Sequence, residues 1–102
     1  MKKIVVLDFL ATKEIDSFPR EIGARFNDLF KILSKEGKLE MPFAKKIGNR
    51  LFEIRIKHEG QWRSIYAYVL KNQVIILSAF QKKTQKTPKK ELTKALKRLK
   101  KY

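Results

Sequence analysis

The sequence predicts an α+β fold, with helices packed on a small, mainly antiparallel sheet. Two patterns predict it: stretches with apolar residues at the spacing of amphipathic helices, and three consecutive β-like runs separated only by tight turns. Strands joined by tight turns pair antiparallel, whereas parallel strands need a long crossover. The expected element order is therefore β-α(α)-β-β-β-α, in one domain that covers residues 1–102.

The N-terminal segment is expected to form the first strand, over residues 3–9, because it is apolar and rich in β-branched residues. With its leading lysines it resembles the start of a signal peptide. However, Asp8 interrupts the apolar run, and no small-residue cleavage site follows. We therefore interpret the segment as part of the fold.

Two helices are expected next, a short one over 12–17 and a longer one over 19–36. Pro19 suits the first turn of the longer helix, and Gly37 suits the position just after its end. The apolar stripe of the longer helix consists of Ile22, Phe26, Leu29, Phe30 and Leu33. This spacing predicts that one face of the helix is buried.

Residues 38–50 are expected to form an irregular connection, with a turn near its end. Three strands follow, over 51–58, 61–70 and 74–80. The first alternates apolar and charged residues, which is typical of a strand with one covered face. The last is apolar on both faces, which predicts a central position in the sheet.

The polar residues 81–87 are expected to form a loop, with Thr87 capping a last helix that begins at Pro88. The narrow apolar stripe of this helix consists of Leu92, Ala95, Leu96 and Leu99, and nearly all its other residues are basic. The helix is therefore expected to cap the fold with a strongly cationic outer surface.

The formal net charge of +15 is unevenly distributed. Residues 1–40 carry a net charge of +1, residues 41–81 carry +5, and residues 82–102 carry +9. Such a gradient predicts a polyanionic partner for the second half of the chain: nucleic acid, the ribosome or an anionic membrane.

A membrane partner is disfavoured, because no apolar run approaches the roughly 18 residues needed to span a bilayer. The basic C-terminal helix also lacks bulky aromatic residues on its apolar face, except Tyr102. With no cysteine and only His58, the chain has neither a disulfide framework nor a cysteine or histidine metal cluster. We expect a cytoplasmic protein without membrane, metal or cofactor.

Strand alternation places Glu53, Arg55 and Lys57 on one face, expected to be the open face of the sheet. Arg63 and Tyr66 lie on the following strand, but they have opposite parity. Either Arg63 lies at a bulge or strand end, or the two residues face apart, and alternation alone leaves both possibilities open.

Further cations are candidates for contact with a nucleic-acid backbone. They are Lys57 on the first of the three strands, Lys86 in the loop, and Lys89, Lys90, Lys94, Lys97, Arg98 and Lys101 on the last helix. A solvated polar surface would explain the same pattern without any function.

Three segments resemble the RelE/HigB-like toxins of bacterial type II toxin–antitoxin modules, in particular their phage-derived, host-killer-like branch. These segments are 51–55 (LFEIR), 62–66 (WRSIY) and 79–88 (AFQKKTQKTP). The resemblance implies a RelE-like fold and a ribosome-dependent mRNA endonuclease that inhibits translation. It also implies metal-independent attack of an RNA 2′-hydroxyl on the phosphodiester, and a cognate helix-turn-helix antitoxin as partner.

The resemblance also implies roles for six residues. Arg63 is expected to bind the scissile phosphate and Arg55 to lie on the active face, while Lys82 and Lys83 are expected to stabilise the transition state. Tyr66 matches a recurring tyrosine of undetermined role. Glu53 stands where RelE has a lysine, so both this carboxylate and a lysine crowded by like charges are candidate bases.

Two other functions remain open. A non-catalytic nucleic-acid- or ribosome-binding module would account equally well for the charge gradient. It would not require Arg55, Arg63, Lys82 and Lys83 to converge. A free-standing RNase would cleave naked RNA without ribosomes.

Overall fold

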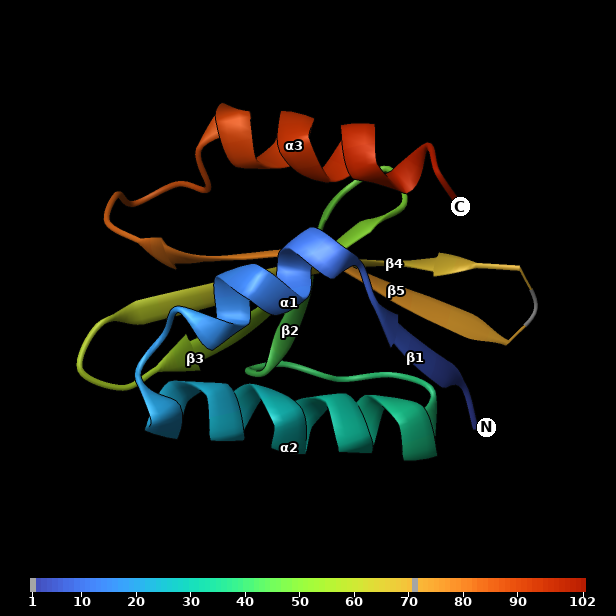
Figure 1. Cartoon of the computed structure of the whole chain (residues 1–102), viewed down its shortest axis with the longest axis horizontal. Coiled ribbons are helices and arrows are strands. Elements are labelled where there is room, and N and C mark those ends of the chain that lie inside the picture. The colour runs from blue at the N-terminus through green and yellow to red at the C-terminus, as the bar shows by residue number, and fades with distance from the viewer. Residues whose placement is uncertain (1, 71) are drawn as a thin grey trace.

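A five-stranded sheet forms the centre of the computed structural model, which describes residues 2–70 and 72–102 (Figure 1). The strands are β1 (Ile4–Leu7), β2 (Ala44–Gly48), β3 (Leu51–Lys57), β4 (Gln61–Val69) and β5 (Gln73–Lys82). They lie in the order β1-β5-β4-β3-β2. Only the β1–β5 pair is parallel. The prediction of a mainly antiparallel sheet is confirmed, and so is the central position of β5.

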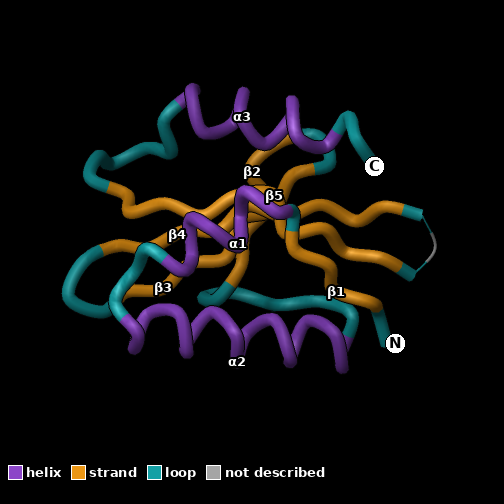
Figure 2. Tube along the Cα trace, viewed as in Figure 1, coloured by secondary structure: helices purple, strands orange, loops and turns teal. Residues whose placement is uncertain are grey.

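The helices are α1 (Phe9–Asp16), α2 (Arg20–Glu36) and α3 (Lys89–Leu99). Figure 2 shows α2 on one side of the sheet and α3 on the other. One core joins α1 and α2 to side chains such as Ile54, Trp62 and Tyr66. A second core lies under α3 and includes Leu51, Ile65 and Ala95.

The second core corrects the expectation of an open sheet face. Glu53 and Arg63 lie on the α3 side of the sheet and are both 3% exposed. The apolar stripe of α3 needs a partner surface, and Ile65, Ala67 and Leu77 supply it. The charged row of β3 is therefore partly covered rather than open.

The first strand ends at Leu7, and not at Phe9 as predicted, because Asp8 is the N-cap residue of α1. Its carboxylate accepts a hydrogen bond from the Leu10 backbone at 3.1 Å, as an N-cap residue does. At the end of α2, Gly37 adopts φ 81°, and its N–H donates to the Leu33 carbonyl at 2.8 Å. A residue without a side chain tolerates this left-handed conformation.

Strand β2 was not predicted, since residues 38–50 were expected to be irregular. It is a five-residue edge strand with two exposed lysines and a register shift between Lys46 and Gly48. Short, charged and bulged strands are typical of protected sheet edges, and they carry little alternation to detect. Strand β5 also extends two residues beyond the prediction, so that Lys82 pairs with Gln61.

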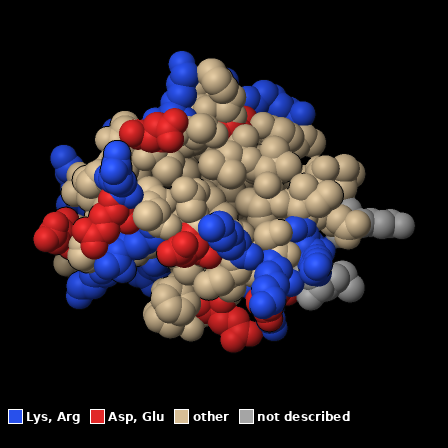
Figure 3. All heavy atoms as spheres, turned by 60° about the horizontal axis from the view of Figure 1, so that its bottom comes forward, with Lys and Arg blue, Asp and Glu red and all other residues tan. Residues whose placement is uncertain are grey.

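The side of the molecule that carries α2 shows acidic and basic side chains intermixed (Figure 3). This matches the near-neutral charge of the N-terminal part of the sequence. Among the described residues, the longest helix is the 17-residue α2, and no helix is both long and apolar enough to cross a membrane.

Candidate nucleic-acid and catalytic site

Four of the six predicted catalytic residues come together on the α3 side of the sheet. Arg55 pairs directly with Arg63 across β3 and β4, and Lys82 pairs with Gln61 across β5 and β4. Opposed residues in a sheet share a face, and alternation along β3 adds Glu53 to it. Three neighbouring strands thus contribute Glu53, Arg55, Arg63 and Lys82.

Tyr66 lies on the opposite face, so the question left open by alternation is settled. It is 1% exposed and packs in the core under α1 and α2, with its ring 5.4 Å from that of Phe52. Burial raises the pKa of its hydroxyl well above the ordinary value of 10.0. Tyr66 therefore does not line the cationic cluster and is placed for a structural role.

Arg63 and Glu53 form a buried ion pair. The Arg63 Nε lies 3.3 Å from Glu53 Oε1, and both side chains are 3% exposed. Burying a lone charge is costly, so each group requires the other. Burial lowers the pKa of Arg63 and nearby Arg55 lowers it further, while Glu53 raises it. An arginine nevertheless remains charged at all physiological pH values.

The guanidinium of Arg63 is held from two further sides. Its Nη1 donates to the Trp62 carbonyl at 3.0 Å, and its Nη2 donates to Gln61 Oε1 at 3.1 Å. These bonds fix the orientation of the guanidinium, which is 3% exposed and lines a hollow of about 350 Å³. A guanidinium is a planar group with several N–H donors, which suits it to a phosphate.

Thr87 connects the loop before α3 to this ion pair. Its hydroxyl donates to Glu53 Oε2 at 2.6 Å. The prediction that Thr87 caps α3 is therefore wrong: Pro88 is the N-cap residue, and no side chain caps the helix. Both oxygens of Glu53 have partners within the protein, which argues for a positioning role rather than proton abstraction.

Two adjacent hollows flank the cluster, with volumes of about 410 and 350 Å³. Arg55 lines both of them, Lys82 the first and Arg63 the second. Among the described residues, Glu53 is the only acidic one that lines them, against seven basic ones: Lys45, Lys46, Arg55, Lys57, Arg63, Lys82 and Lys86. The lining is therefore suited to a polyanion.

Lys82 and Lys83 differ although they are neighbours in sequence. Lys82 is partly buried, and burial followed by the charge of Arg63 lowers its pKa. Lys83 is exposed, lies beyond the end of β5 and lines neither hollow. Only Lys82 is placed beside Arg63.

Three of the predicted nucleic-acid-binding cations hold α3 against the rest of the protein. Arg98 donates to Glu14 at 2.8 and 3.0 Å and to the Leu77 carbonyl at 2.8 Å. Lys94 lies 3.5 Å from Glu14, and Lys101 lies 2.9 Å from the buried Asp8. In contrast, Lys89, Lys90 and Lys97 are exposed, while Lys57 and Lys86 line the hollows.

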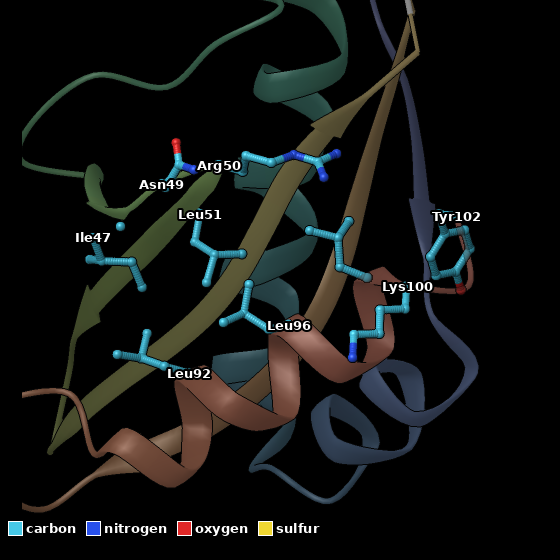
Figure 4. A pocket seen from close by; sticks show the side chains of 10 residues that line it. Ile47, Asn49, Arg50, Leu51, Leu92, Leu96, Lys100 and Tyr102 are labelled. Carbon is cyan, nitrogen blue, oxygen red and sulfur yellow. The ribbon is translucent and has the colours of Figure 1, made fainter.

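A larger hollow lies between α3 and the β2–β3 turn (Figure 4), next to the 410 Å³ hollow, with which it shares Ile47 and Leu92. It measures about 680 Å³ and has an apolar floor formed by Ile47, Leu51, Leu92 and Leu96. Its charged lining residues are Arg50 and Lys100. Within residues 2–70 and 72–102, no cluster of three or more histidine, aspartate or glutamate side chains suits a metal ion.

Sequence reasoning missed Thr87 and Gln61 as parts of the site. Neither has a charge, and each acts by orienting a charged neighbour: Thr87 contacts Glu53, and Gln61 contacts Arg63. Alternation along β4 places Gln61, two residues before Arg63, on the same face of the sheet. No local pattern predicts the contact of Thr87, which spans 34 positions in sequence.

The sheet order and the helices on both faces define the fold of the RelE toxins. A variant of the Escherichia coli toxin RelE in the free state superimposes with a TM-score of 0.75 at 16% identity, covering 97% of this chain and 99% of that chain. A chain of the toxin–antitoxin complex RelBE2 from Mycobacterium tuberculosis gives a TM-score of 0.61 at 20% identity, covering 80% of this chain and all of that one.

The model of the family described as phage-derived protein Gp49-like matches residues 13–100. The chain belongs to this family. Among curated proteins, none matches the chain. The predicted resemblance to a phage-derived branch of RelE-like toxins is thereby confirmed.

Proposed function

We propose that this protein is the toxin of a type II toxin–antitoxin module and that it cleaves mRNA on the ribosome. The observation that carries the proposal is the convergence of Arg55, Arg63 and Lys82, from three strands, around two hollows that share Arg55 as a lining residue. A module that only binds nucleic acid needs a basic surface, but it does not need a buried carboxylate that orients one arginine. Family membership and the RelE fold support the same proposal.

The proposed reaction is attack of an RNA 2′-hydroxyl on the adjacent phosphorus. A bond forms between the 2′-oxygen and phosphorus, and the bond from phosphorus to the 5′-oxygen breaks. The 2′-hydroxyl loses a proton and the leaving 5′-oxygen gains one, so the products are a 2′,3′-cyclic phosphate and a 5′-hydroxyl. Negative charge that develops on the phosphoryl oxygens requires fixed positive charges nearby.

The contacts of each residue support the proposed roles. Arg63 lines one hollow and would bind the phosphate there, with Arg55 beside it on β3. Lys82 is the cation of this cluster best suited to release a proton, because arginine stays protonated and burial lowers the pKa of Lys82. Glu53 positions Arg63, and Lys83 contributes to backbone contact rather than to chemistry.

The ribosome and its RNA are the proposed polyanion for the remaining lysines. Lys86 lines one hollow, and Lys89, Lys90 and Lys97 are exposed near or on α3. Electrostatic contacts of this kind position a nucleic acid without reading its sequence. The proposed inhibitor is an antitoxin, by analogy with the toxin–antitoxin complex that shares the fold. The resemblance to phage-derived RelE-like toxins leads us to propose that this antitoxin is a helix-turn-helix protein encoded beside the toxin.

Expression in a bacterial host tests the proposal, with mRNA ends mapped after induction. We expect growth arrest with cleaved mRNA for the wild type and for Lys83→Ala, but normal growth and intact mRNA for Lys82→Ala. The two lysines are adjacent and carry the same charge. A difference between the two variants therefore reflects the position of Lys82 in the site and not the loss of one positive charge. Growth arrest with intact mRNA would favour the non-catalytic binding module.

Ribosome dependence is tested with purified components. We expect the wild type to cleave mRNA bound to ribosomes and to leave the same naked RNA intact. Equal cleavage of both substrates would identify a free-standing RNase and would refute the proposed dependence on the ribosome.

A further inference from the structure

Phe43 is an exposed aromatic residue at the edge of the cationic cluster. Its side chain is 51% exposed, and that of nearby Met41 is 71% exposed. Single exposed apolar side chains are common and need no explanation. Phe43 is unusual because it lines the same 350 Å³ hollow as Arg55 and Arg63.

The sheet register places Phe43 in line with the two arginines. Ala44 pairs with Ile54, and the Arg55 N–H donates to the Phe43 carbonyl at 2.8 Å. Phe43 therefore continues β2 by one residue, opposite Arg55, which is itself opposite Arg63. Opposed residues share a sheet face, so one aromatic ring and two guanidinium groups follow one another across three strands.

The backbone that carries Phe43 is fixed before any ligand arrives. Its N–H donates to the Glu40 carbonyl at 2.9 Å, and the Ala44 N–H donates to the same oxygen at 3.2 Å. In the part of the chain that the structure describes, the ring–ring contacts involve only Phe18, Phe26, Phe30, Phe52, Trp62, Tyr66 and Tyr68. The backbone of Phe43 is thus fixed, and the residue lines both the 350 Å³ hollow and a second one beside α2, with no aromatic ring among the described residues stacked on it.

We propose that Phe43 is a stacking platform for a nucleobase of the RNA whose phosphate contacts Arg55 and Arg63. Neighbouring strands lie about 4.8 Å apart, so Phe43 is about 5 Å from the Arg55 strand and about 10 Å from the Arg63 strand. A nucleotide with its phosphate on the arginines places its base within reach of this ring. Stacking on an aromatic ring tolerates every base, because every base has a π-face.

This inference rests on the proposed function, since it takes the ligand to be RNA. The test compares binding of two strands of equal length and charge: a 2′-O-methyl RNA oligonucleotide, which has no 2′-hydroxyl to react, and its abasic counterpart. Measurements at one fixed salt concentration are essential, because phosphate contacts depend strongly on salt.

Replacing the ring should weaken binding only when bases are present. For Phe43→Ala we expect affinity for the RNA strand to fall about 5- to 150-fold, and affinity for the abasic strand to stay unchanged. Phe43→Trp should retain RNA affinity, whereas Phe43→Leu should lose it despite keeping apolar bulk. Phe9→Ala is the matched control, because Phe9 is 67% exposed and lies under the Lys13 ammonium on α1, outside both hollows.

The outcomes distinguish the two proposals. If Phe43→Ala lost affinity equally for the RNA strand and the abasic strand, or for neither, the stacking role would be refuted while the RNA-binding function stands. If the wild type bound neither strand with or without ribosomes, the proposed function and the stacking role would fall together.

Discussion

Neutralising Glu53 should destabilise the protein through Arg63. The change Glu53→Gln keeps the size of the side chain and an oxygen that accepts from Thr87, but it removes the charge 3.3 Å from the Arg63 Nε. Both side chains are 3% exposed, so little water replaces the lost partner. The guanidinium is then buried with only neutral acceptors, the Trp62 carbonyl and Gln61 Oε1.

The size of the effect follows from this burial. Removing one partner of a buried ion pair costs about 3–5 kcal/mol, and the retained hydrogen bonds of Arg63 favour the lower end. For a domain of this size, 1 kcal/mol lowers the melting temperature by about 4–8 °C. We therefore expect Glu53→Gln to melt roughly 12–25 °C below the wild type.

A double-mutant cycle measures the pair directly. Circular dichroism during urea unfolding gives the free energies for the wild type, Glu53→Gln, Arg63→Met and the double variant. We expect the double variant to be more stable than the sum of the single effects predicts, because neither charge is then left alone. Additivity within about 0.5 kcal/mol would show that the two residues do not depend on each other, and would refute the positioning role of Glu53.

Three further predictions concern α3 and Lys82. Glu14→Ala should lower the free energy of unfolding by about 2 kcal/mol in urea titrations, because Arg98 loses two charged hydrogen bonds; an unchanged value would show that this contact does not hold α3. Burial raises the pKa of Asp8, but hydrogen bonds from Lys101 and Tyr102 more than offset this and lower it below 3.8, so Asp8 stabilises the fold above that pH. The difference in melting temperature between the wild type and Asp8→Asn should then shrink as the pH falls below 3.8, and a constant difference would contradict this. Burial and Arg63 lower the pKa of Lys82 from 10.5, so the RNA affinity of the wild type should decline at a lower pH than an ordinary lysine would cause. Lys82→Arg should keep its RNA affinity over the same alkaline range. If the wild type and Lys82→Arg lost affinity at the same pH, Lys82 would be excluded as the titrating group.

The sheet and the long helix were predictable because each follows one strong periodicity. The alternation of β3 and the stripe of α2 both reflect a single buried face. Strand β2 was missed because only five residues pair at an edge, with a bulge near its end. The start of α1 was misplaced because Asp8 looks like an interruption of an apolar strand, whereas it caps the next helix.

The site was predictable only in part, for a similar reason. Parity groups Glu53 with Arg55 within one strand, but it says nothing about which residues of the next strand oppose them. The register that pairs Arg55 with Arg63 also places Tyr66 opposite Phe52, on the other face. That register is a tertiary property, set by the hairpin and by the two cores. The contact between Thr87 and Glu53 depends further on where α3 docks.

The same docking gives the excess positive charge of the chain a structural task besides binding. Arg98 and Lys101 are bound to acidic groups of α1 and its N-cap, and hold α3 on the sheet. This placement brings Thr87, just before α3, against Glu53, and Glu53 in turn orients Arg63. Mutations that loosen α3 should therefore reduce the proposed activity through Arg63, and not only by weakening the proposed contact with RNA. A net charge concentrated at the C-terminus thus serves the geometry of the site as well as the attraction of a polyanion.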